Sequence, residues 1–490
     1  MTTETPKLPI SIKTYFGIGQ IAEGVKNTGF TTFLLFYYNS VLGLSGTFAG
    51  TALLIALVFD AVSDPLVGSL SDSFKHRLGR RHPFMIASAI PLAVTFGLIF
   101  SPPEGLGQIG LFLWLTGFAI LVRASMTLYH VPHMALGAEL TSDYHERTVV
   151  VAYRSGFGAL GVGLVLWLGW SFFFPDVDGR LGRFDPAAYR SFGWVFGAIM
   201  STSILVSAWG TRSVIPSLPK PPEDVPPFHF RRLIGEFKEA LENESFRALV
   251  FGLILFFATR GVQDALGIHM GTYFWNLSAS EIQLLQAAAV PAFVLGLPFW
   301  VRMTRFIDKG SAFLIGIGLL TTFTMVCPLL QLLGWYPPPE SPVYLGALIG
   351  CTSIAVFGAT AGAVNAGSMI ADVTDEHELR TGRRQEGIFF AALAFAVKAT
   401  VGIGQFVAGV SIDVIGLTAG ASPESVSPET IRALGFVFGP GTALLGFASL
   451  FVLTGYRLNR QRHSEIMAEL KNRRAARNRA VSTDSALDVS

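Results

Sequence analysis

Twelve stretches of about 20 predominantly apolar residues follow one another along this chain, and they constrain its fold more than any other feature. A helix of this length spans the hydrocarbon core of a bilayer. Because 51% of the residues are hydrophobic and only 14% are charged, the composition lies outside the range of soluble domains. The sequence predicts an all-α integral membrane protein with spans near 15–42, 46–72, 83–102, 109–138, 149–174, 191–211, 248–275, 281–304, 312–334, 342–371, 386–416 and 432–456.

Positive charge is distributed unevenly between the two sides of this arrangement. Most of the 36 Lys and Arg residues fall in segments on the side of the N-terminus, and such segments are usually cytoplasmic. We therefore expect both termini in the cytoplasm of a cell whose plasma membrane, the inner membrane in a bacterium, holds the chain. A net charge of +2 predicts no nucleic-acid partner, and two cysteines in apolar stretches predict neither a disulfide framework nor a metal cluster.

A Pro-rich and then charged segment divides the spans into six and six. It reads PSLPKPPEDVPPF and continues as a helix-like charged run, as expected of a linker between two bundles. The basic segment after the last span is expected to lie against anionic lipid on the cytoplasmic face. The predicted parts are an N-terminal bundle at 1–212, a linker at 213–247, a C-terminal bundle at 248–456 and a basic tail at 457–490.

An internal repeat supports this division. The segment AELTSDYHERT (138–148) after the fourth span aligns without gaps with ADVTDEHELRT (371–381) after the tenth, and Glu139 falls opposite Asp372. The same spacing carries Pro65 onto Pro298. Parallel repeats of six helices are typical of the major facilitator fold, in which two halves related by pseudo-symmetry rock about a site near the membrane midplane.

Two carboxylates in the second span are the first candidates for chemistry. Asp60 and Asp64 are four residues apart and share a helix face. They repel unless a proton or a metal cation joins them, and Ser63 offers a further oxygen. The alternative is that Asp64 caps a helix break at Pro65 while Asp60 pairs with a lysine. Lys398 has no acid within one helical turn, so we expect its partner on the Asp60/Asp64 face.

Other charges inside the spans form pairs at helical spacing. Glu23 with Lys26, and Arg260 with Asp264, stand one turn apart and can neutralise each other. Charged residues in a span are costly unless they are paired or face a wet cavity. Mutual neutralisation and contact with a transported solute are both compatible with the first pair.

The run LGRRHPF after the second span is a positive-inside anchor and also a candidate cytoplasmic gate. Gly79 permits a tight turn, and Arg80 and Arg81 can reach acids of neighbouring loops when that side closes. Asp72, Asp143, Glu146, Asp372, Asp375 and Glu376 are the acids available. The predicted gate comprises Asp72, Gly79, Arg80, Arg81, Asp143, Asp372 and Arg383.

The runs FDAVSDPLVGSLSDSFKHRLGRRHPF (59–84) and SMIADVTDEHELRTGRRQEGIFF (368–390) resemble those of the glycoside-pentoside-hexuronide:cation symporters, and the resemblance extends over roughly the whole chain. It implies a sodium or proton site made by Asp60, Asp64 and Thr127, with Ser63 beside them. It also makes Lys398 similar to a lysine near that cation site, with a role in coupling.

The resemblance breaks where that family binds its sugar. Family members use one acid in the first span and one in the fourth, whereas this chain has Gly24, next to Glu23, at the first position and His130 at the second. Arg154 resembles a family arginine in the fifth span. Glu23, Lys26, His130 and Arg154 are the predicted solute-binding residues, and the cations among them, with Arg123, favour a hexuronide or another anionic glycoside.

The sequence thus predicts cation-coupled symport of a sugar or glycoside by alternating access, with no cofactor other than Na⁺ or H⁺. Other readings stay open, namely symport of a lysophospholipid-like solute, proton-driven export, and a non-transporting membrane sensor. The sequence shows no constellation of a nucleophile and a base, so we do not expect an enzyme. We expect the chain to function as a monomer.

Overall fold

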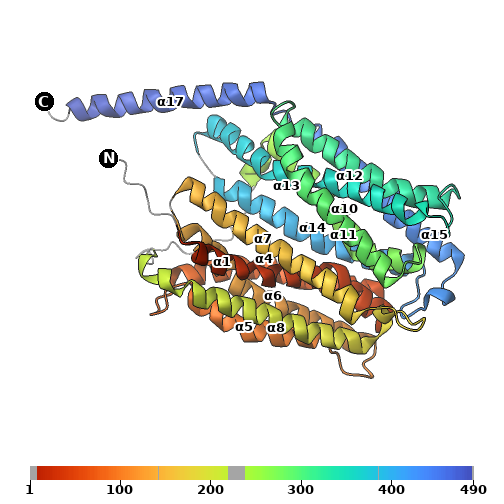
Figure 1. Ribbon diagram of the computed structural model, residues 1–490. Coiled ribbons are helices and arrows are strands. Elements are labelled where there is room, and N and C mark those ends of the chain that lie inside the picture. Colours follow the sequence, from red (N-terminus) through yellow and green to blue (C-terminus); the bar gives the residue numbers. More distant parts are fainter. Residues whose placement is uncertain (1–7, 142, 219–234, 236–237, 384–385, 488–490) are drawn as a thin grey trace. The chain divides into compact units, whose positions relative to one another are not determined.

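The computed structural model describes residues 8–141, 143–218, 235, 238–383 and 386–487. Helices make up nearly all of the regular structure in this part of the chain (Figure 1). The contacts between helices divide the chain into two compact units. Unit 1 comprises Met1–Phe228, Arg260–Gln286 and Val401–Phe438, and unit 2 comprises His229–Thr259, Ala287–Thr400 and Gly439–Ser490.

The first span is helical throughout but irregular. It consists of α1 (Ile10–Ile18), α2 (Gln20–Thr28), the π-helical turn η1 (Gly29–Phe33), α3 (Leu34–Phe36) and the π-helical turn η2 (Tyr37–Val41). The next elements in chain order are α4 (Gly46–Ser73), α5 (His82–Ile99), α6 (Gln108–Glu139), α7 (Tyr144–Leu168), η3 (Gly169–Phe173), η4 (Gly182–Phe184), α8 (Pro186–Gly210) and η5 (Arg212–Ser217).

The later elements repeat this succession of long apolar helices. They are α10 (Glu244–His269), η6 (Met270–Phe274), α11 (Ala279–Met303), α12 (Lys309–Leu332), α13 (Val343–Thr381), α14 (Glu386–Val414), η7 (Pro423–Ser425), α15 (Pro428–Phe436), η8 (Val437–Gly441), α16 (Thr442–Leu453) and α17 (Arg460–Leu487). Among the described residues, ten helices are long and apolar enough to cross a membrane. With the irregular first span and α14, they correspond to the predicted windows and confirm an all-α integral membrane protein.

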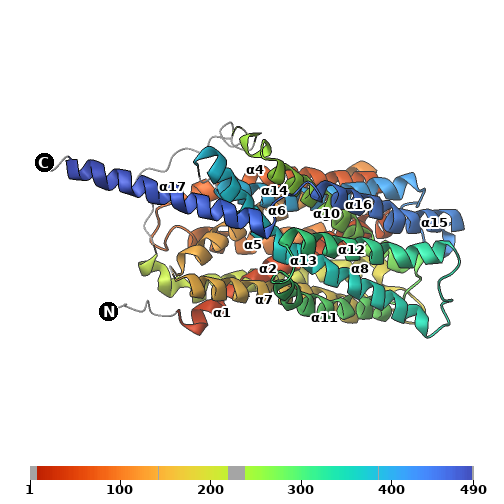
Figure 2. The ribbon, with the colours of Figure 1, turned by 90° about the horizontal axis from the view of Figure 1, so that it is seen from above.

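Within unit 1, α4 packs along α6, and α5 packs along both α6 and α8 (Figures 1 and 2). The Ser45 side chain caps the start of α4 by accepting a hydrogen bond from the Phe48 amide. The helix continues through Pro65 to Ser73, so Asp64 does not cap a helix break. Pro65 has no N–H to offer the Ala61 carbonyl group one turn earlier.

Segments from late in the chain complete unit 1. The Asp413 carboxylate, near the end of α14, accepts hydrogen bonds from Ser45 Oγ at 2.5 Å and from the amides of Gly46 and Thr47 at 2.8 Å each. The backbones approach so closely that a Cβ placed on Gly409 would lie 2.1 Å from the Gly46 carbonyl oxygen. Asp413 therefore supplies the anion that the start of α4 favours.

Arg183 makes a second connection of this kind, outside the spans. Its guanidinium donates to the Leu277 carbonyl oxygen at 2.6 Å and to Thr272 Oγ1 at 3.2 Å. Burial lowers the pKa of Arg183, whereas the nearby Asp176 carboxylate raises it. The Asp176 carboxylate also accepts a hydrogen bond from the Ala279 amide at 2.7 Å.

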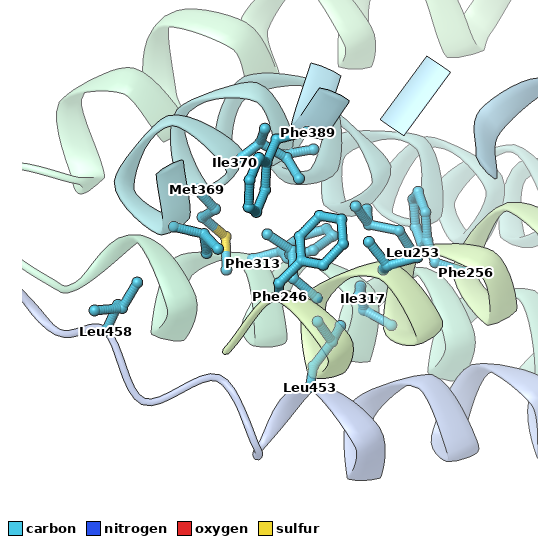
Figure 3. Packing of buried hydrophobic residues seen from close by; sticks show 14 of the residues in the cluster. Phe246, Leu253, Phe256, Phe313, Ile317, Met369, Ile370, Phe389, Leu453 and Leu458 are labelled. Atoms are coloured by element: carbon cyan, nitrogen blue, oxygen red, sulfur yellow. The ribbon is translucent and has the colours of Figure 1, made fainter. Parts of the chain in front are cut away.

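Unit 2 is built around an apolar core in which α10, α12, α13 and α16 meet (Figure 3). Ile466 and Leu470, from the beginning of α17, are buried in the same core, and Figure 2 shows this part of α17 beside α13. The tail therefore starts as part of unit 2. The predicted division at 1–212, 213–247, 248–456 and 457–490 stays a prediction, and much of the predicted linker lies outside the described residues.

Candidate cation and solute site

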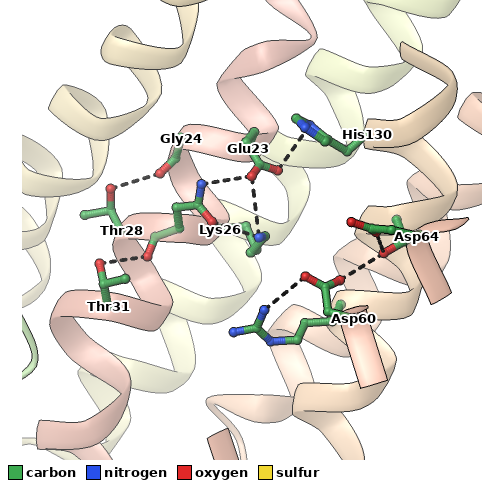
Figure 4. A network of polar contacts seen from close by, with 11 residues as sticks. Glu23, Gly24, Lys26, Thr28, Thr31, Asp60, Asp64 and His130 are labelled. Carbon is green, nitrogen blue, oxygen red and sulfur yellow. Dashed lines mark hydrogen bonds and ion pairs between the residues drawn. The ribbon is translucent and has the colours of Figure 1, made fainter. Parts of the chain in front are cut away.

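The packing of α4 on α6 brings Asp60, Asp64 and Thr127 together. Thr127 Oγ1 lies 3.0 Å from Asp60 Oδ1 and 2.9 Å from Asp64 Oδ1. Asp60 and Thr127 are buried, with 6% and 2% of their surface exposed, and Asp64 is half-buried. The three side chains are thus arranged as the resemblance implies (Figure 4 labels both carboxylates).

The Thr127 hydroxyl cannot satisfy both carboxylates. It has one hydrogen, so it can make a full hydrogen bond to only one of its two acidic neighbours. A proton on one carboxyl, or a metal cation among the three oxygens, would complete the arrangement and also offset the repulsion between the acids. The three side chains are therefore a candidate site for a proton or a metal cation.

Arg123, one helical turn before Thr127 on α6, supplies a fixed cation to this site. Its Nη1 lies 3.3 Å from Asp60 Oδ2, and only 7% of the residue's surface is exposed. The guanidinium also faces the Phe30 ring of the first span, 5.5 Å from the ring centroid, at the distance of a cation–π contact. Sequence reasoning noted Arg123 as a charge inside a span but did not identify Asp60 as its partner.

Two further residues were predicted to serve the cation site. The Ser63 hydroxyl lies 3.3 Å from the Asp60 carbonyl oxygen and can donate to it. Lys398 lies half-buried on α14 within unit 2. Cation ligation by Ser63 and coupling through Lys398 stay predictions.

Three of the four predicted solute-binding residues form one cluster. Glu23 Oε1 lies 3.6 Å from Lys26 Nζ, and Glu23 Oε2 lies 3.5 Å from His130 Nδ1 (Figure 4). Asn27, which the sequence reasoning did not identify, donates to Glu23 Oε1 at 2.9 Å and accepts from Lys26 at 2.8 Å. Glu23 and Lys26 therefore lie close enough to neutralise each other, and the contact of Glu23 with His130 joins α2 to α6.

Arg154 makes a different contact. It lies half-buried on α7, and its guanidinium lies 2.7 Å from the Met134 sulfur of α6. This contact places Arg154 beside α6. Its role in solute binding stays a prediction.

The basic run after α4 forms an ion-pair cluster in unit 1. Arg80 and Arg81 both reach Glu139 Oε1 at 2.8 Å, and Arg81 also contacts Asp72 at 2.5 Å. Gly79 has a positive φ of 73°, a conformation that glycine adopts without strain. Asp72, Gly79, Arg80 and Arg81 are thus brought together, with Glu139 at the end of α6 as their shared acid.

The other predicted gate residues have different partners. Asp143 caps α7 through the Glu146 amide at 2.8 Å, and Arg383 pairs with Glu239. Asp372 is held by Lys309 Nζ at 2.7 Å within unit 2. The internal repeat already aligned Glu139 with Asp372, and both now hold basic residues that precede the next helix. That alignment was the signal from which Glu139 could have been predicted.

The sequence comparisons place these features in a family. Residues 15–460 match the family of MFS/sugar transport proteins, so the chain belongs to that family and has the major facilitator fold. It is a multi-pass membrane protein, and its fold and family are those of transporters rather than enzymes.

Individual relatives are distant but span the whole chain. A symporter of Bacillus subtilis, YnaJ, is 25% identical over 96% of this chain and 97% of its own length. YagG of Escherichia coli, named as a glycoside/cation symporter, is 25% identical over 97% and 98%. The sphingosine-1-phosphate transporter MFSD2B of Xenopus tropicalis is 24% identical over 94% and 90%. The crystal structure of the nucleoside transporter NupG is similar in fold, with a TM-score of 0.58 at 14% identity over 90% of this chain and 99% of NupG.

Proposed function

We propose that this chain couples the movement of one monovalent cation to the symport of a sugar or glycoside. The observation that carries the proposal is the convergence of Asp60, Asp64 and Thr127 on one point, where two carboxylates lie within hydrogen-bond distance of one hydroxyl. Membership of the MFS/sugar transport family and similarity to a protein named as a glycoside/cation symporter support the same function.

In this proposal the cation acts by changing the charge of a buried site. Asp60 and Asp64 repel each other, and Arg123 contacts Asp60. A bound cation lowers the net negative charge of this group, so the protein can move the site from one side of the membrane to the other at lower cost. The cation is Na⁺ or H⁺, and it is transported rather than retained.

The solute is proposed to bind near the cluster of Glu23, Lys26 and His130. This cluster shares α6 with the cation site, so both sites depend on the position of one helix. Arg154 and Lys398 are retained as proposed contributors to solute binding and to coupling. We further propose that both termini are cytoplasmic, that Asp72 to Arg81 with Glu139 stabilise closure of that side, and that the monomer is sufficient for transport.

A second candidate solute is a phosphate-bearing lipid. The relative named as a sphingosine-1-phosphate transporter matches over most of both chains. Lys26, His130 and Arg154 would suit an anionic headgroup as well as an anionic sugar. A screen that includes lysophospholipids next to glycosides distinguishes the two.

Proteoliposomes provide the test. A panel of methyl glycosides and the matching uronides is supplied outside, with an inward gradient of Na⁺ or of H⁺. For a neutral glycoside, one cotransported cation gains about 2.3 kcal/mol per 100 mV of membrane potential, which corresponds to about 50-fold accumulation. A uronide that moves with one cation carries no net charge, so the cation concentration gradient alone drives its accumulation. Asp64→Asn should abolish accumulation yet permit exchange of solute across the membrane. Accumulation at the wild-type level in Asp64→Asn would refute the proposal. Accumulation of the solute only under an outward cation gradient would show that solute and cation move in opposite directions.

A further inference from the structure

Arg123 is an arginine inside a membrane span whose hydrogen-bonding capacity is largely unused. A guanidinium has five N–H donors. Among the described residues, its one ion-pair contact is Nη1 to Asp60 Oδ2 at 3.3 Å. Charge-assisted hydrogen bonds of this type are usually about 2.7–2.9 Å long, so the contact with Asp60 is a weak one.

One of the remaining donors is buried without a partner. Nε has no hydrogen-bond partner among the described residues, although only 7% of the Arg123 surface is exposed. The guanidinium faces Phe30 of the first span, the same span that carries Glu23 and Lys26. Burying a charge without good partners is expensive. A purely structural arginine would be expected to have a closer, two-pronged partner.

The position of Arg123 links the cation site to the solute cluster. On α6 it precedes Thr127 by four residues and His130 by seven, so all three side chains project from neighbouring turns of one helix. A cation that binds at Asp60 competes directly with Arg123 for that carboxylate. When it wins, the guanidinium needs another anion.

We propose that Arg123 is the anion-binding residue for the solute, and that the coupling cation makes it available by replacing it at Asp60. This inference rests on the proposed symport and names the class of solute, a glycoside that carries a carboxylate or another anionic group. Cation and anionic solute then favour each other's binding, because the cation releases Arg123 from Asp60 and the solute neutralises the released Arg123.

The proposal makes an unusual prediction for Arg123→Gln, namely tighter cation binding. Removing a unit charge at about 4 Å changes a cation's affinity by on the order of 1,000-fold at an effective dielectric constant near 20. Arg123→Lys keeps the charge and should stay closer to the wild type. Arg260→Gln, which removes a more exposed arginine from another span, in the Arg260–Asp264 pair at 2.7 Å, is the control.

The experiment measures thermal stability of the purified full chain during a NaCl titration at pH 8, with N-methylglucamine chloride keeping ionic strength constant. Arg123→Gln should reach half-maximal stabilisation at about 1,000-fold lower Na⁺ than the wild type, or respond to Na⁺ where the wild type does not. An equal or weaker response of Arg123→Gln overturns the competition. If neither protein responds to Na⁺ or to pH, symport itself is overturned.

The solute arm uses the methyl glycosides of glucose, galactose and xylose, with the uronides of the two hexoses. A uronide should stabilise the wild type more than its neutral counterpart does, and this preference should disappear in Arg123→Gln but persist in Arg260→Gln. A preference that survives in Arg123→Gln, or stabilisation of the wild type by neutral glycosides alone, overturns the role of Arg123 in solute binding.

Discussion

Asp413 offers a sharp test of how unit 1 is held together. Its carboxylate accepts hydrogen bonds from Ser45 Oγ and from the amides of Gly46 and Thr47, the first two residues of α4. These amides have no partner within the helix. Asp413→Ala removes all three bonds at once, and Asp413→Asn keeps the shape but removes the charge.

The magnitude follows from the number and kind of these bonds. A hydrogen bond to a charged group contributes about 1.5–3 kcal/mol, and loss of a helix N-cap costs about 1 kcal/mol. Water can replace part of the lost bonding at a partly exposed site. We therefore expect Asp413→Ala to destabilise the junction by about 3 kcal/mol, equivalent to a factor of about 150 in the opening equilibrium. Asp413→Asn should cost about half as much.

Hydrogen–deuterium exchange of the peptide covering residues 44–50 measures this opening directly. Exchange at the Gly46 and Thr47 amides should accelerate by about 100-fold in Asp413→Ala. Ser427→Ala is the control, because it removes the equivalent cap of α15, where Ser427 Oγ accepts from the Thr430 amide at 3.2 Å. Unchanged exchange at residues 46 and 47 in Asp413→Ala would refute the reasoning.

Three further predictions concern packing and ion pairs. Glu139→Gln removes the acid shared by Arg80 and Arg81 and should lower the free energy of unfolding by about 2 kcal/mol or more. The control Glu465→Gln, in an exposed pair, should cost under about 0.5 kcal/mol. Equal effects of the two variants in thermal unfolding would contradict a stabilising role of Glu139. Gly409→Val places a side chain against the Gly46 carbonyl oxygen and should speed hydrogen–deuterium exchange in both α4 and α14. The control Gly318→Val, at a position with open space around it, should not. Similar exchange in both variants would argue against the close approach of Gly409 to Gly46. Ile466→Ala or Leu470→Ala should destabilise unit 2 by about 2–4 kcal/mol. The control Met467→Ala, at an exposed position, should not. Unchanged stability after either core change would show that α17 is not anchored in the core of unit 2.

The spans could be predicted because their signal is local. Length and apolarity decide whether a helix crosses a membrane, and both are read directly from a window such as 46–72, observed as Gly46–Ser73. The π-helical turns Gly29–Phe33 and Tyr37–Val41 could not be predicted. Nothing in FTTF or YYNS requires one extra residue per turn, because that geometry depends on neighbouring helices.

The candidate site was only partly predictable for the same reason. The spacing of Asp60 and Asp64 places them on one face, and the family resemblance pointed to Thr127. The pairing of Asp60 with Arg123 depends on which turns of α4 and α6 meet, and helix register across an interface is not written in either segment alone. The contact of Arg123 with Asp60 was therefore not predicted, and the expected pairing of Lys398 with the Asp60/Asp64 face stays a prediction.

Cation movement that depends on solute tests the central claim most directly. Proteoliposomes containing an indicator for Na⁺ or for pH are held without any cation gradient, and a transported glycoside is added outside. The account predicts inward movement of the cation, driven by the solute gradient and abolished by Asp64→Asn. Entry of the solute without cation movement, or unchanged cation movement in Asp64→Asn, would contradict it.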